Sequence, residues 1–323
     1  MRNAIGPVCL AKCRDVNSET GAKKSAMWQL IGLGGVFVAI GVGYTLEGGK
    51  FGVILDAIGP ELLTILGPGV ATLLISNELG TVKAVFAGFK KVVSGAHWRR
   101  PDYSDALCLL FLLFRVARQE GNLALEKHIE EPDSSPVFGR YPRLAADHHF
   151  VSFVADVFRA ITLNFTDPYK VGEMMETEID KWHDEEMRAP KALSAMADAL
   201  PALGIVAAVL GVIKAMGAIN ESPDILGHMI GTALVGTLLG VFLSYGLFGP
   251  IAARMKGVLE EEGIMLGIVR QMITSHLEGL GPQMAVEVGR KSVPSQFQPS
   301  FDEMDRLLTE TARNSRAKGD APA

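Results

Sequence analysis

The chain has few cysteines and no long stretch in which apolar and polar residues alternate. Its three cysteines include Cys9 and Cys13, whose CxxxC spacing has no third ligand nearby and matches neither a zinc knuckle nor a redox CxxC pair. We therefore expect free thiols in a reducing compartment. Because a strand with one buried face alternates apolar and polar residues, the lack of such segments predicts an all-α protein.

Motifs for catalysis, nucleotide binding and metal binding are also scarce. The sequence contains no GxSxG and no Rossmann fingerprint, so we expect no enzyme and no catalytic residue. His148-His149 and the cluster at 183–186 lack HExxH spacing, and adjacent helical positions point about 100° apart, which disfavours a shared metal. The net charge of -5 leaves no electrostatic footprint for nucleic acid. We expect no cofactor and no metal site.

Long uncharged apolar runs, in contrast, are abundant. Ala199–Ile219 carries one charge, Lys214, and Ile225–Ala253 carries none. Each run exceeds the ~20 apolar residues that a helix needs to cross a bilayer core about 30 Å thick. The polar residues 220–224 between them predict the tip of a helical hairpin. A hydrophobic fraction of 48% favours several spans combined with a substantial aqueous domain.

Two further spans are predicted nearer the start of the chain. Met27–Leu46 is uncharged and longer than the ~7–15 apolar residues of a signal peptide, which indicates a retained span. Leu62–Ser76 contains Pro68 and reaches membrane length only if residues 77–80 lie at the interface. Basic residues cluster before the first span and after the second and fourth, so the positive-inside rule places both termini and the middle of the chain in the cytoplasm.

The expected fold is an all-α membrane protein with four transmembrane helices and a large helical cytoplasmic domain inserted between helices 2 and 3. Within the insertion, Ala106–Phe114 is too short to cross a membrane and predicts a core helix. Asp167 before Pro168 predicts a helix start. The predicted segments are an N-terminal cytoplasmic extension (1–26), transmembrane helices 1 and 2 (27–80), the cytoplasmic helical domain (81–198), transmembrane helices 3 and 4 (199–253), and C-terminal cytoplasmic helices with a tail (254–323).

The hairpin combines small residues at four-residue spacing with a lack of acidic residues. Such spacing lets helix backbones approach closely in lipid. The small residues are Gly204, Ala208, Gly227, Gly231, Gly236, Gly240 and Ser244. A proton or cation path normally needs an ionisable group at depth, and the two helices provide only hydroxyls. A path along this hairpin is therefore predicted to need a carboxylate from another chain.

Four segments of the sequence resemble a known family of membrane proteins. Asp198–Val212, DALPALGIVAAVLGV, resembles the third span of MotA, the ion-conducting stator subunit of the bacterial flagellar motor. VGTLLG at 235–240, followed by Ser244-Tyr245-Gly246 and Pro250, resembles its fourth span. Outside the membrane the similarity continues through Tyr141-Pro142-Arg143 and AVEVGRK at 285–291. It covers about residues 27–312.

The resemblance implies a multi-pass protein of the bacterial inner membrane that takes part in flagellar rotation and chemotaxis. MotA-like subunits form a homo-oligomeric ring, pictured as a pentamer, around MotB, a single-span protein that supplies an aspartate. Ion passage through this complex is converted into torque on the rotor protein FliG.

The resemblance also assigns an ion pathway. Thr237 is expected to face the MotB helix, although a threonine bonded to its own helix carbonyl is the structural alternative. Sodium-type relatives carry a threonine where this chain has Ala208. With one oxygen fewer, the transported ion is expected to be H+, with Na+ as the disfavoured alternative.

Coupling and torque positions follow in the same way. Pro201 and Pro250 match prolines that couple ion binding to movement of the cytoplasmic domain, although Pro201 alone also fits a first-turn proline. Arg118 and Glu126 match the rotor contact, and Gly121 is expected to break the helix between them. Their alternative is two ordinary surface charges.

Two other functions compete with the stator. An ExbB or TolQ-like proton-channel subunit that energises the outer membrane would share the mechanism but have three spans and an N-terminus outside. A non-conducting membrane scaffold would keep the fold and lose the need for Thr237 and Pro201.

Overall fold

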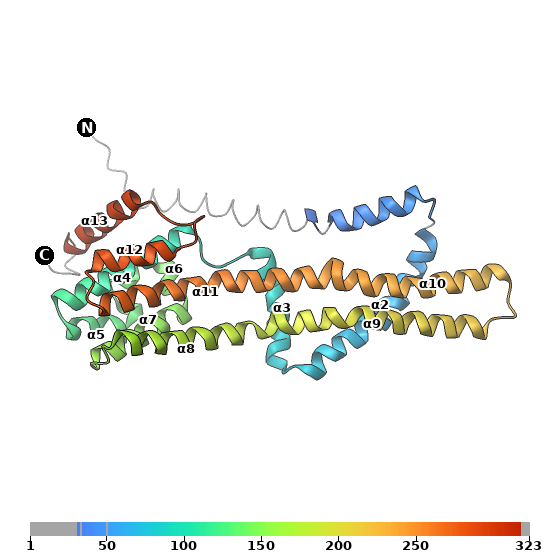
Figure 1. Ribbon diagram of the computed structural model, residues 1–323, viewed down its shortest axis with the longest axis horizontal. Helices are drawn as coiled ribbons and strands as arrows, with labels where there is room; N and C mark the ends of the chain where they lie inside the picture. Colours follow the sequence, from blue (N-terminus) through green and yellow to red (C-terminus); the bar gives the residue numbers. More distant parts are fainter. Residues whose placement is uncertain (1–30, 33, 50, 318–323) are drawn as a thin grey trace, which may run out of the picture. The chain divides into compact units, whose positions relative to one another are not determined.

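The computed structural model describes residues 31–32, 34–49 and 51–317. The predicted extension 1–26 and the start of the first predicted span lie outside the described residues. Within the described part every regular element is helical (Figure 1). The α-helices are Gly34–Leu46, α2 (Phe51–Ser76), α3 (Leu79–Ser94), α4 (Arg100–Gln119), α5 (Asn122–Glu130), α6 (Pro142–Ala145), α7 (His148–Thr162), α8 (Pro168–Glu186), α9 (Arg188–Gly217), α10 (Pro223–Val241), α11 (Gly249–Leu277), α12 (Pro282–Ser292) and α13 (Phe301–Ala317).

Short irregular helices complete the described chain. Two 3₁₀ turns lie at Pro132–Ser134 (η1) and Phe138–Arg140 (η2), and a π-helical segment, η3 (Phe242–Phe248), joins α10 to α11. The chain divides into two compact units, the first within 1–95 and 185–259 and the second within 96–184 and 260–323.

The first unit contains the apolar helices α2, α9 and α10. Among the described residues, three helical stretches are long and apolar enough to cross a membrane, and they include α2, α8–α9 and α10–α11. α9 and α10 run side by side and α2 packs against both (Figure 1). Many large apolar side chains on these helices are exposed, such as Ile75 at 85% and Leu63 at 76%. Such a surface is compatible with lipid and with further protein chains.

The second predicted span begins earlier than expected, and this boundary is a correction. α2 starts at Phe51 rather than Leu62 and gains its length from residues 51–61, with no need for residues 77–80. Asp56, Pro60 and Glu61 suggested that the apolar run begins after them. In a membrane helix, proline is tolerated where neighbouring helices and local adjustments satisfy the freed backbone groups, and both Pro60 and Pro68 lie inside α2.

The second unit is built around α4. The predicted core stretch Ala106–Phe114 is buried throughout, which confirms that it is a core helix. The aromatic face of α7 is also buried, including Phe150, Phe153 and Phe158. Asp167 starts α8 as predicted, because its Oδ1 accepts hydrogen bonds from the backbone N–H groups of Tyr169 and Lys170 at 3.0 and 3.2 Å.

The Tyr141-Pro142-Arg143 motif fixes the start of α4. Arg143 Nη2 lies 3.1 Å from Oδ2 of the buried Asp102, and the same oxygen accepts a 2.8 Å hydrogen bond from the backbone N–H of Arg99. Burial raises the pKa of the Asp102 carboxyl, an effect that the Arg99 hydrogen bond and the Arg143 charge oppose. The motif therefore keeps a buried carboxylate at the first turn of α4 paired.

Gly121 separates α4 from α5. Its φ of +81° lies in the left-handed region, which costs glycine little and other residues more. Arg118 near the end of α4 and Glu126 in α5 are both exposed on either side of this break. The predicted helix break is confirmed.

Candidate functional site

The hairpin of α9 and α10 is held together by backbone contact at glycines. A β-carbon built on Gly204 would lie 2.9 Å from the carbonyl oxygen of Gly236, and one built on Gly240 would lie 2.7 Å from the carbonyl oxygen of Leu200. Real side chains essentially never approach backbone this closely. The predicted close approach of the two helices is confirmed at these positions. The backbones can come this close because glycine has no side chain to separate them.

Thr237 and Ala208 lie beside this contact. A β-carbon on Gly236 would lie 3.1 Å from that of Ala207, so these two residues meet where the helices cross. Thr237 follows Gly236 in the sequence, and Ala208 follows Ala207. Both Thr237 and Ala208 are half-buried in the single chain. The structure thus brings the two predicted pathway residues to the same level of the hairpin.

The two predicted coupling prolines occupy different backbone settings. Pro250 is the second residue after the π-helical segment, whose last turn is closed by a hydrogen bond from the Gly249 N–H to the Ser244 carbonyl. Proline has no N–H to continue an α-helical ladder, and such widened turns often occur at functional sites. This segment had no counterpart in the sequence-based prediction.

Pro201 lies inside a helix rather than at its start. α9 begins at Arg188 and continues to Gly217, so the alternative of a first-turn proline is wrong. The helix of the hairpin extends upstream because Ala189, Ala192, Leu193 and Met196 are buried against other helices of the first unit. An interior proline removes one backbone hydrogen bond and favours a bend.

Glu61 is the functional candidate that sequence reasoning missed. It lies in α2, and its Oε2 atom would be 2.7 Å from a β-carbon built on Gly236. This oxygen is buried and has no hydrogen-bond partner in the described part of the chain. The sequence-based prediction considered carboxylates only on the two hairpin helices, and Glu61 of α2 adds one beside them. The missed signal was the apolar sequence on both sides of Glu61, from Phe51 to Ser76.

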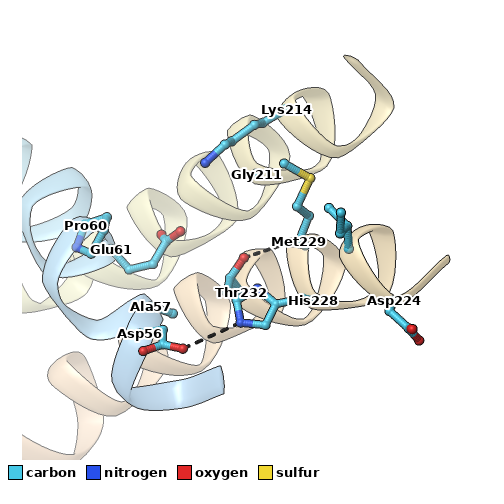
Figure 2. A pocket seen from close by; sticks show the side chains of 11 residues that line it. Asp56, Ala57, Pro60, Glu61, Gly211, Lys214, Asp224, His228, Met229 and Thr232 are labelled. Atoms are coloured by element: carbon cyan, nitrogen blue, oxygen red, sulfur yellow. Dashed lines mark hydrogen bonds and ion pairs between the residues drawn. The ribbon is translucent and has the colours of Figure 1, made fainter. Parts of the chain in front are cut away.

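Glu61 lines a pocket between α2, α9 and α10, shown in Figure 2. The pocket has a volume of about 560 Å³. Asp56 Oδ2 and His228 Nε2 lie 3.6 Å apart across it, and Thr232 donates a 2.9 Å hydrogen bond to the Met229 carbonyl. Lys214 of α9 and Asp224 at the start of α10 add two more charged groups.

The pocket contains several charged side chains but is not a metal centre of the usual composition. Among the described residues, no group of three or more His, Cys, Asp or Glu side chains is placed to hold a metal ion. The pocket instead combines carboxylates with an imidazole and an ammonium group. Such a set can exchange protons with water.

Comparison with known families identifies the chain. A family model described as "Motility protein A N-terminal" matches residues 30–121, and one described as "MotA/TolQ/ExbB proton channel family" matches residues 147–266. Motility protein A of Escherichia coli (strain K12) is 34% identical over 277 residues, which cover 85% of this chain and 92% of that protein. The chain belongs to the motility protein A family.

Other members and a solved structure agree with this assignment. The chemotaxis protein LafT of Vibrio parahaemolyticus is 30% identical over 284 residues, which cover 88% of this chain and 99% of LafT. A solved structure of C. jejuni MotAB has a TM-score of 0.66 at 20% identity and covers 82% of this chain and 95% of its own. This last likeness shows the fold alone. As a member of this family, the chain is a membrane protein with a proton-channel family domain.

The predicted rotor contact lies in the second unit. Arg118 borders a pocket of about 390 Å³ between α4, α5, α7 and α11. His276 stacks on Phe114 in this pocket, with ring centroids 4.3 Å apart. Arg118 is thus an exposed charge at the edge of this pocket and Glu126 an exposed charge in α5, whereas the pathway residues lie in the first unit.

Proposed function

We infer that this chain is the stator subunit of a bacterial flagellar motor, which with a MotB-like partner conducts protons and converts their flow into torque on the rotor. The observation that carries this conclusion is the 34% identity to Motility protein A over 85% of the chain. The proton channel family match over residues 147–266 covers the hairpin that contains the predicted pathway.

For the ion pathway, we propose that Thr237 and Ala208 face the membrane helix of the partner. Supporting this, the two residues lie at one level of the hairpin, beside the Gly204–Gly236 contact. Beyond Asp224, α10 contains no acidic residue, so an aspartate on the partner helix remains the natural acceptor on this face.

The proposed ion is the proton. Ala208 has no side-chain oxygen, and Na⁺ needs several oxygen ligands, whereas a proton needs one acceptor and a water. Proton transport also agrees with the family model, whose description names a proton channel.

The proposed topology has four transmembrane helices, with both termini in the cytoplasm of a bacterium and the chain in its inner membrane. The apolar helix Gly34–Leu46 would provide the described part of the first span, and α2, α9 and α10 the other three. In this proposal the helical domain 81–198 and the residues after 253 lie in the cytoplasm. The subunits form a ring, proposed to be a pentamer, around the partner.

For torque, we propose that Arg118 and Glu126 contact the rotor protein FliG. Both are exposed and lie on either side of the Gly121 break. Opposite charges on a sliding interface would steer docking without tight binding. Pro201 and Pro250 would transmit ion binding to this surface, because each interrupts the hydrogen-bond ladder of a long helix.

The proposed function is tested by expressing the full chain with its single-span partner in a flagellated strain that lacks its own stator. Restored swimming that stops on addition of a protonophore, and continues without sodium, is the expected result. A chain that reaches normal abundance in the membrane but restores no swimming would overturn the proposal, as would swimming that depends on sodium.

A further inference from the structure

We propose that the pocket between α2, α9 and α10 is a proton-binding site within the stator subunit itself, with Glu61 as the group that takes the proton. The inference rests on the proposed function, because it adds a step to the same ion path. It assigns to this chain a carboxylate that works in addition to the aspartate expected from the partner.

The position of Glu61 is the first argument. Its Oε2 atom is buried at the notch that Gly236 leaves in α10, and no donor in the described chain reaches this oxygen. A buried carboxylate oxygen without a donor is costly, whereas the protonated acid is neutral and can itself donate a hydrogen bond. The site therefore favours uptake of a proton over a permanent negative charge.

Access to water is the second argument. Glu61 also lines the pocket of about 560 Å³, which is open enough to hold several water molecules. Figure 2 shows Glu61 extending from α2 toward α9, with Asp56 and His228 paired on the side of the hairpin tip. The carboxyl group thus lies between water and the helix crossing.

The other charged groups around the pocket are the third argument. Asp56 projects from α2, Lys214 from α9, and Asp224 and His228 from α10. The imidazole Nε2 of His228 lies 3.6 Å from the Asp56 carboxylate. With an ammonium and an imidazole present, the site suits proton exchange better than a metal cation, which prefers several oxygens.

The step itself is a reversible proton transfer. Hydronium in the pocket gives its proton to Glu61 Oε2, which leaves water and a neutral carboxylic acid. The acid later returns the proton to a water molecule on the path toward the partner's acceptor and becomes a carboxylate again.

The test uses the full chain and its partner in the strain without its own stator, with rotation speed of single motors measured between about pH 5.5 and 8.5. Glu61→Gln keeps the size and polarity of the side chain but cannot bind a proton. We expect it to slow rotation roughly tenfold or more and to flatten the pH profile. Glu61→Asp is expected to restore most of the speed with a shifted profile.

The matched control is Glu221→Gln, which removes an exposed carboxylate at the hairpin tip outside the pocket. It is expected to behave like the unmodified chain. If Glu61→Gln rotates with the same speed and pH profile as the unmodified chain, Glu61 only fills the notch at Gly236 and the inference is wrong.

A second measurement covers the case in which Glu61→Gln does not accumulate. Isotope-edited infrared spectra of the purified wild-type and Glu61→Asp complexes are expected to show a carboxylic acid band that titrates with pH and shifts between the two. Identical spectra would overturn the inference. Failure of the unmodified chain to drive rotation would instead overturn the proposed function, and this inference with it.

Discussion

Gly204 of α9 is in backbone contact with Gly240 of α10, since a β-carbon built on Gly204 would lie 3.0 Å from the Cα atom of Gly240. Neither backbone can yield as a flexible side chain would. We therefore expect Gly204→Ala to destabilise the hairpin by about 1–3 kcal/mol through overpacking. Thermal unfolding of the detergent-solubilised full chain measures this loss.

Gly227→Ala is the matched control for this prediction. Gly227 lies in the same hairpin, and a β-carbon there meets nothing within 4 Å. Alanine should be neutral or stabilise α10 by up to about 1 kcal/mol, because glycine is a poor helix former. Equal unfolding temperatures for the two variants would contradict the importance of the Gly204 contact.

Pro250→Ala is expected to separate stability from function. Alanine restores the backbone N–H after the π-helical segment, so the chain should unfold at the same temperature or higher. Rotation should nevertheless fall by roughly tenfold if the interrupted ladder couples the ion path to torque. Pro282→Ala, at the first turn of α12 where the N–H has no helical partner, serves as control. A fast motor with Pro250→Ala would remove Pro250 from the coupling path.

Charge reversal at the proposed rotor contact should strongly slow rotation without preventing assembly. Arg118→Glu or Glu126→Lys is expected to reduce torque by roughly tenfold. Each reversal would replace attraction to an oppositely charged rotor residue by repulsion at a transient interface. Membrane abundance and complex formation with the partner should stay unchanged, since both side chains are exposed. Lys170→Glu, an exposed charge on α8, is the control. Normal swimming in the Arg118→Glu, Glu126→Lys double variant would speak against both assignments.

Glu287 and Arg290 make the second unit sensitive to acid. Arg290 donates two hydrogen bonds of 2.6 Å to the Glu287 carboxylate and one of 2.8 Å to the Pro299 carbonyl. The hydrogen bonds from Arg290 lower the pKa of Glu287 below its usual 4.5. Because the folded pKa is lowered, the stabilisation is complete above about pH 4.5 and is lost as the pH falls through the folded pKa.

Glu287→Gln should therefore cost about 1–2 kcal/mol at pH 7 and progressively less in acid. The two unfolding curves, followed by circular dichroism, should converge as the pH falls below the lowered pKa of Glu287. Glu310→Gln removes an exposed carboxylate from α13 and should leave stability unchanged throughout. A cost for Glu287→Gln that does not depend on pH would show that the pair acts through packing instead.

Helices with a clear apolar face were predictable from the sequence. Phe150, Phe153 and Phe158 recur at helical spacing and are buried in α7, and the hairpin runs exceed membrane length. The start of α2 was not predictable in the same way. Asp56, Pro60 and Glu61 are charged or helix-breaking residues, so the span was predicted to start after them. Their place inside α2 depends on the helices that pack around them.

The pathway was predictable only in part. The glycine spacing of α9 and α10 indicated close helix contact, because small residues are the local cause of it. The pocket at Glu61 depends on three helices that are far apart in sequence, so no local pattern reveals it. The π-helical segment likewise depends on how Phe242–Phe248 packs before Gly249-Pro250, and its residues resemble any apolar helix.

The π-helical turns at Phe242–Phe248 change the direction in which the side chains after them point. A π-helical bulge contains one residue more than an α-helix of equal length, and each residue of an α-helix turns the chain by about 100°. Side chains after Phe248, such as Met255, therefore point in a direction that an uninterrupted helix would not give them. Insertion or deletion of one residue in this segment would rotate every side chain of the helix after it, while the side chains before it kept their positions.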